Sequence, residues 1–155
     1  MRTPALLAAA LLVAAPAAHA AAYRLGQIEV AQPWSRPAAA GMTGAGYMTI
    51  ANRGKTADTL KAVETAAARK VEIHSSSTAG GMMKMRRLEN GLPIPAGQSV
   101  ALAPGGNHLM LIGLTKALKS GDKVPATLVF ASGTRLKIEL SVGLSAPAAE
   151  GHGHH

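Results

Sequence analysis

The chain has 155 residues, enough for one domain, and its 16 basic and 8 acidic residues give a formal charge of +8. It contains no cysteine, which excludes disulfides and every metal centre that depends on a thiolate ligand. Aromatic residues make up 3% of the chain and no basic run exceeds two residues, so the charge does not indicate a nucleic-acid-binding protein.

The first twenty residues differ in composition from the rest of the chain. Arg2 is followed by an uncharged apolar run over residues 5–15, and Ala18-His19-Ala20 fits a small-x-small cleavage site. This pattern predicts a secretory signal peptide over residues 1–20, cut after Ala20, and therefore an exported, periplasmic protein. The apolar run is short for a membrane span and there is no cysteine to carry a lipid, so we expect a soluble mature protein.

Beyond the signal, the chain consists of short alternating segments separated by turn residues. Strands are expected over residues 27–30, 46–54, 58–63, 69–75, 82–88, 98–106, 108–114, 125–132 and 135–142. A loop is expected over residues 76–81, turns over 92–97 and 119–124, and at most one helical turn over 65–70. The period-2 alternation and the frequent turn signals favour an all-β sandwich over a βαβ fold.

The end of the chain differs from these alternating segments. The stretch SAPAAEGHGHH has no alternation, and three of its last four residues are histidines: His152, His154 and His155. We therefore expect a single β-domain over residues 21–144 and a flexible, histidine-rich tail over residues 145–155.

Two histidines remain once those of the signal and the tail are set aside, and each has methionines nearby. In the stretch NHLM, a strand would place His108 and Met110 on one side, opposite the neighbouring leucines. In VEIHS, His74 faces away from the aliphatic side of its strand, and Met85 follows eleven residues later, beyond a glycine-bearing loop. If the strands around that loop form a hairpin, two imidazoles and two thioethers can converge.

Such a ligand set is soft and uncharged, which suits Cu(I) and suits Zn(II), Ca(II) or Mg(II) poorly. Taken singly, each residue has an ordinary explanation, because a lone methionine usually fills a core and a lone histidine is usually a satisfied polar residue. The combination is more specific, since it uses both histidines of the domain. Met82 and Met83 stay ambiguous, because a loop could leave them exposed or place them over the site.

Two other classes of copper protein can be weighed from the same residues. Electron-transfer cupredoxins are excluded, because their blue-copper centres require a cysteine. A copper enzyme is not indicated, since the sequence shows no clear general base or substrate pocket.

The order His74, ten residues, Met85, twenty-two residues, His108-x-Met110 resembles that of the periplasmic copper chaperones of the PCu(A)C family. The segments PWSRP, AGYMTIAN, ADTL, VEIH, GGMMKMRRLE, LPIPAG, PGGNHLMLIGL and LKSGDKV resemble that family in the same order, over roughly residues 28–142. The second spacer is one residue longer than in the family's usual pattern, a difference that concerns loop length.

The resemblance implies a cupredoxin-like β-sandwich of Greek-key type, without enzymatic activity, that binds one Cu(I) through His74, Met85, His108 and Met110. It also implies delivery of copper to the copper-A site of cytochrome c oxidase subunit II, directly or through another periplasmic copper chaperone. The alternative is a periplasmic copper-buffering or resistance protein without a dedicated oxidase acceptor. Some relatives bind Cu(II) in a His/Met-rich C-terminal extension, which makes His152, His154 and His155 candidate Cu(II) ligands.

Partner surfaces are less clearly marked than the ligands. We expect a monomer with no nucleic-acid partner and no membrane span after signal cleavage. Arg86 and Arg87 flank the Met85 segment and are candidate docking charges for an acidic partner protein, although two arginines at a strand end are more often simply solvated.

Overall fold

The computed structural model describes residues 22–148, and within this range every regular element is a β-strand. The strands are β1 (Ala22–Leu25), β2 (Ile28–Ser35), β3 (Gly44–Asn52), β4 (Asp58–Glu64), β5 (Ala68–Ala79), β6 (Met82–Arg87), β7 (Leu92–Ile94), β8 (Ser99–Leu102), β9 (His108–Leu114), β10 (Lys123–Phe130) and β11 (Arg135–Val142). The all-β class is therefore confirmed. Residues 22–148 contain no helix with the length and apolar character needed to cross a membrane.

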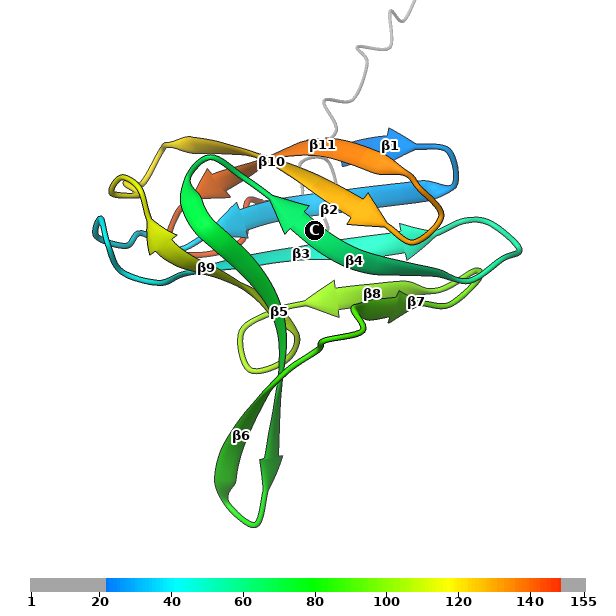
Figure 1. The fold of residues 1–155 in the computed structure, drawn as a ribbon, viewed down its shortest axis with the longest axis horizontal. Coiled ribbons are helices and arrows are strands. Elements are labelled where there is room, and N and C mark those ends of the chain that lie inside the picture. Colours follow the sequence, from blue (N-terminus) through cyan, green and yellow to red (C-terminus); the bar gives the residue numbers. More distant parts are fainter. Residues whose placement is uncertain (1–21, 149–155) are drawn as a thin grey trace, which may run out of the picture.

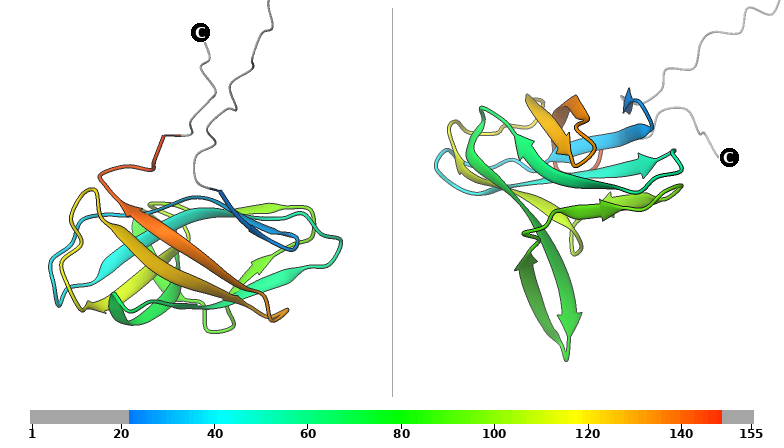
Figure 2. Two further views of the ribbon diagram at one scale, coloured as in Figure 1. Left: turned by 90° about the horizontal axis from the view of Figure 1, so that it is seen from above. Right: turned by 45° about the vertical axis from the view of Figure 1, so that its right-hand side comes forward.

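The strands form one mixed sheet that curls back over itself (Figures 1 and 2). Hydrogen-bonded neighbours follow the order β6-β5-β9-β3-β2-β11-β10-β4-β7, with β1 beside β2 and β8 beside β3. Among these strands only β2 and β11 pair in parallel, and the other pairs are antiparallel. The strands in the middle of this order enclose the core, and β6, β5 and β9, at one end of the order, hold the candidate site.

Alternation decides which side of each strand faces the core. In β11 the even-numbered residues from Leu136 to Val142 are buried, and the residues between them are exposed or half-buried. One continuous hydrophobic cluster fills the space enclosed by the curled sheet, and its members include Ile50, Leu60, Ile94, Leu109 and Leu128. The sheet thus encloses its apolar face and leaves its outer face free for polar side chains.

The hairpin of β5 and β6 projects from the body of the sheet (Figure 1, and the right-hand view of Figure 2). The first part of β5 pairs with β9 as far as His74, whereas residues 75–79 pair with β6 alone among the described strands. All six residues of β6 are exposed. The turn consists of Gly80 and Gly81, whose φ angles of 59° and 77° suit glycine in a two-residue hairpin turn.

Several local predictions differ from the structure. Residues 76–79 continue β5 in place of the expected loop, because their pairing with β6 extends to the glycine turn. Residues 92–94 form β7 beside β4, where the prolines predict a turn. Residues 65–70 contain a turn and the start of β5, so the helical turn is wrong. The short strand β1 is not predicted at all; it pairs with β2.

Candidate metal site

His108 is the first residue of β9, and its neighbours set the direction of its side chain. Leu109 and Leu111 are 0% and 1% exposed in the core, so His108 and Met110 lie on the outer face of the sheet. His108 is nevertheless buried, and its Nδ1–H donates a hydrogen bond to the carbonyl oxygen of Gly106 at 3.0 Å. In a neutral imidazole this leaves Nε2 as the nitrogen with a free lone pair.

His74 is the direct cross-strand partner of His108, from β5. The two ring centroids lie 5.8 Å apart, with an angle of 38° between the ring planes. Bonds from an imidazole nitrogen to a metal ion such as zinc are about 2 Å long, so rings at this separation can flank a single ion. The two histidines, which are 34 positions apart in the sequence, therefore form one pair.

Met110 lies on the same face as the histidine pair. It follows His108 by two residues on β9, and two residues along a strand share a face. Across the strands it is the direct partner of Glu72 and the diagonal neighbour of His74. Its side chain is half-buried. Diagonal neighbours in antiparallel strands are about 7–8 Å apart, a distance that a methionine side chain can bridge.

Met85 approaches His74 from the opposite side, on β6. The direct partner of His74 in this strand is Arg87, and Met85 lies two residues before it, opposite Ser76. Met85 is therefore the diagonal neighbour of His74 on the same face. It is 52% exposed. The register thus brings the four predicted ligand residues onto one face, with His74 in the middle.

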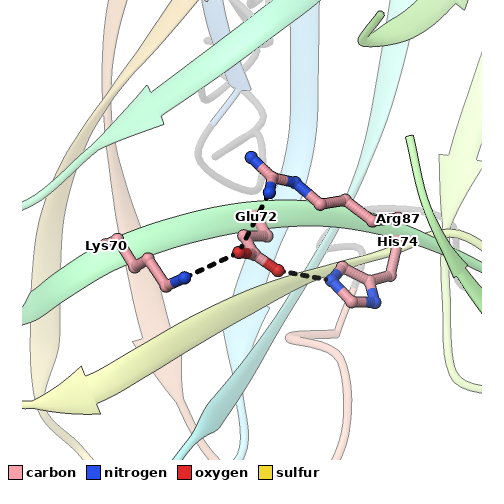
Figure 3. A network of polar contacts seen from close by, with 4 residues as sticks. All are labelled: Lys70, Glu72, His74 and Arg87. Atoms are coloured by element: carbon pink, nitrogen blue, oxygen red, sulfur yellow. Dashed lines mark hydrogen bonds and ion pairs between the residues drawn. The ribbon is translucent and has the colours of Figure 1, made fainter. Parts of the chain in front are cut away.

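Glu72 joins this group through a polar network that Figure 3 shows. His74 Nε2 lies 2.9 Å from Oε2 of Glu72, while Oε1 of Glu72 lies 2.9 Å from Nζ of Lys70 and 3.5 Å from a guanidinium nitrogen of Arg87. The hydrogen bond with His74, then that with Lys70, and the charges of Arg87 and Lys70 lower the pKa of Glu72 to about 2.

The sequence gives no reason to expect a role for Glu72, although this residue lies two positions before the candidate ligand His74. The signal was the alternation in VEIH, which puts a carboxylate two residues before a candidate ligand. Its ion pair with Arg87 and its place opposite Met110 depend on the register between strands, which that alternation does not specify.

The other candidate residues fall outside the central group. Met83 lies opposite Thr78, on the same face of β6 as Met85, and Met82 lies on the other face. Within residues 22–148, no three His, Asp or Glu side chains are arranged to hold a metal ion. The expected signal peptide over residues 1–20 and the histidines of the tail (His152, His154 and His155) lie outside the described residues.

Comparison with known proteins gives a family match over most of the chain. Residues 28–142 match the family described as "Putative lipoprotein LpqE-like". A curated relative, "Putative lipoprotein Lxx21020" of Leifsonia xyli subsp. xyli (strain CTCB07), is 33% identical over 115 residues. That alignment covers 74% of this chain and 69% of the relative.

Solved structures give an independent comparison. The copper-bound PCuAC domain from PmoF2 has a TM-score of 0.68 and 29% identity, and the alignment covers 82% of this chain and 99% of that domain. The solution structure of Cu(I)-DR1885 from Deinococcus radiodurans has a TM-score of 0.57 and 30% identity, covering 71% of this chain and 75% of the other. These similarities confirm the expected cupredoxin-like β fold. The chain belongs to the LpqE-like family, which is the family of the PCuAC copper-binding domains.

Proposed function

We propose that this protein is a periplasmic copper chaperone that binds one Cu(I) through His74, Met85, His108 and Met110. The observation that carries the proposal is the direct pairing of the two histidines, with ring centroids 5.8 Å apart, on a face that both methionines share. Imidazole and thioether are soft, neutral ligands that favour Cu(I) over harder ions. The copper-bound structures of related domains support copper as the metal.

The ligand set also supports release of the ion to a partner. Four neutral ligands leave a net charge of +1 on the Cu(I) complex, so an acceptor with anionic thiolates would bind the ion more tightly. Met85 is half exposed, and it lies on the edge strand of the projecting hairpin, where ligands of a partner could approach. We infer that the acceptor is the copper-A domain of cytochrome c oxidase subunit II or another periplasmic copper chaperone.

The site is tested by titrating the protein with Cu(I) under reducing conditions. Met85→Ile combined with Met110→Ile removes both thioethers at nearly constant volume and should abolish stoichiometric Cu(I) binding. Met42→Ile combined with Met82→Ile is the matched control, because it also removes two thioethers from exposed positions. Met82 lies on the other face of β6, and Met42 lies beside Leu114, at the end of β9 remote from His108. Unchanged Cu(I) affinity in the first double variant would refute the ligand assignment.

Delivery is tested separately from binding. The Cu(I)-loaded protein is mixed with a soluble copper-A domain, and the metal content of each protein is measured after separation. Transfer of copper to the copper-A domain is the expected result. If copper stays with this protein at equimolar acceptor, the buffering or resistance role, without a dedicated oxidase acceptor, is the better description.

A further inference from the structure

We propose that Glu72 is a positioning residue for His74: it holds the N–H of the ring on Nε2, so that Nδ1 is the atom that binds the metal. This inference rests on the proposed Cu(I) function. It specifies which nitrogen of each histidine binds the metal, and which residue fixes that choice for His74.

The first argument comes from the hydrogen bond of His74. A carboxylate can only accept, so the 2.9 Å contact between Nε2 and Oε2 of Glu72 requires the proton on Nε2. The neutral ring then carries its lone pair on Nδ1. Figure 3 shows Nδ1 on the side of the ring away from the Glu72 carboxylate.

The second argument is the environment of Nδ1 itself. It is buried, and among the described residues it is the one buried side-chain nitrogen or oxygen without a hydrogen-bond partner. Leaving such a group unpaired is unfavourable. A soft metal ion bound by Nδ1 would supply the missing partner without disturbing the bond to Glu72.

His108 has the opposite arrangement. Its Nδ1–H donates to the carbonyl oxygen of Gly106 at 3.0 Å, and the backbone N–H of Ser76 donates to the same oxygen at 3.2 Å. This carbonyl therefore links the loop before β9 to β5 and holds the N–H of His108 on Nδ1. The structure assigns Nε2 of His108 and Nδ1 of His74 as the two nitrogen ligands.

Glu72 is itself held in place by two cations. Lys70 and Arg87 both contact Oε1, at 2.9 and 3.5 Å, which leaves Oε2 for His74. The side chain of Glu72 is only 12% exposed. Histidines that bind metals commonly donate their other N–H to a carboxylate or carbonyl, and removing that partner typically lowers metal affinity about 10–100-fold.

The assignment is tested by long-range proton–nitrogen correlation spectra of the ¹⁵N-labelled protein, before and after addition of Cu(I) under reducing conditions. Spectra of His74→Gln and His108→Gln identify the two rings. We expect the Cu(I)-induced change at Nδ1 of His74 and at Nε2 of His108, with the other nitrogen of each ring still protonated. Coordination through Nε2 of His74 would overturn this inference and leave the proposed function intact, whereas no change in either ring would refute the Cu(I) site itself.

The role of Glu72 is tested with two variants and a control. Glu72→Leu removes the acceptor, so we expect a mixture of the two ring tautomers of His74 and a loss of Cu(I) affinity of about 10–100-fold. Glu72→Gln keeps a carbonyl acceptor at the same place and should retain the Nε2–H tautomer and most of the affinity. Glu139→Leu, at an exposed position of β11 that makes no salt bridge within residues 22–148, should leave both the tautomer and the affinity unchanged. If Glu72→Leu keeps a pure Nε2–H tautomer, Glu72 does not position His74.

Discussion

Met82 and Met83 are adjacent on β6 and almost equally exposed, at 67% and 66%, yet they face opposite sides of the projecting hairpin. Met83 shares its face with Met85, two residues closer to His74, whereas Met82 does not. The sequence left open which of the two could contribute to the site. The register favours Met83, because it extends the face shared by His74 and Met85 towards the tip of the hairpin.

We expect Met83→Ile to slow the transfer of Cu(I) to a chelating acceptor. Cu(I) affinity should fall by less than the loss of about 10–100-fold expected for Glu72→Leu, because Met83 is not one of the four proposed ligands. Met82→Ile is a closely matched control, with the same residue type, strand and exposure, and it should change neither quantity. Transfer is followed by the absorbance of bicinchoninate mixed with the Cu(I)-loaded protein. Equal rates in the two variants would show that the face of β6 is irrelevant to transfer.

The pKa of Glu72 predicts a specific acid sensitivity of the metal-free protein. In the folded protein this pKa is lowered from 4.5 to about 2, mainly by the hydrogen bond with His74. The ionised carboxylate therefore stabilises the fold fully above pH 4.5, and this contribution is lost as the pH falls from 4.5 towards 2. Glu72→Gln should flatten the pH dependence of the urea midpoint in that window.

The control for acid sensitivity is Glu139→Gln on β11. Glu139 is exposed and makes no salt bridge within residues 22–148. Its replacement should therefore leave the fall of the urea midpoint between pH 4.5 and 2 unchanged. If both variants retain the wild-type curve between pH 4.5 and 2, the Glu72 network does not stabilise the folded state.

Asn52 supports the end of β3 that does not pair with β9. It is 2% exposed; its Nδ2 donates to the carbonyl oxygens of Thr56 and Ile94 at 2.9 and 3.1 Å, and its Oδ1 accepts from the N–H of Gly54 at 3.0 Å. Asn52→Ala leaves the buried carbonyl of Ile94 and two partly buried backbone groups without this partner, so we expect a loss of about 1–3 kcal/mol in the free energy of unfolding.

Urea denaturation measures this loss, with Asn90→Ala as the control. Asn90 is exposed, and its substitution should change the free energy of unfolding by no more than about 0.5 kcal/mol. Cu(I) affinity of the folded Asn52→Ala protein should stay at the wild-type value, because β3 pairs with the site strand β9 at Gly44–Gly46 and Asn52 is at the other end of β3. A Cu(I) defect in that variant would argue against this separation.

The histidine tail is expected to bind Cu(II) independently of the Cu(I) site. Imidazole is a good Cu(II) ligand, so deletion of residues 151–155 should remove Cu(II) binding and spare Cu(I) binding. Replacing His152, His154 and His155 with serine keeps the chain length and should have the same effect. Isothermal titration with each ion separates the two sites, and Cu(II) uptake that survives the triple replacement would contradict the tail assignment.

Much of the fold could be predicted from local patterns, and particular strands show why. The predicted ranges of residues 108–114 and 135–142 coincide with β9 and β11, because period-2 alternation records which side of a strand is buried. Residues 76–81 were harder, since serine, threonine and glycine carry no hydrophobic alternation. The strand conformation of residues 76–79 comes from pairing with β6, so it depends on another segment of the chain.

For the candidate site too, some features follow from the sequence and others only from the tertiary structure. Composition and order alone identified His74, Met85, His108 and Met110 as a soft, thiolate-free set, because ligand chemistry depends on residue type. Only the tertiary structure decided that His74 stands directly opposite His108, that Met83 and not Met82 shares their face, and that Glu72 meets Arg87 beside them. Register between strands distant in sequence sets these relationships, and a shift by one residue would reverse every face, so no single strand's pattern can specify them.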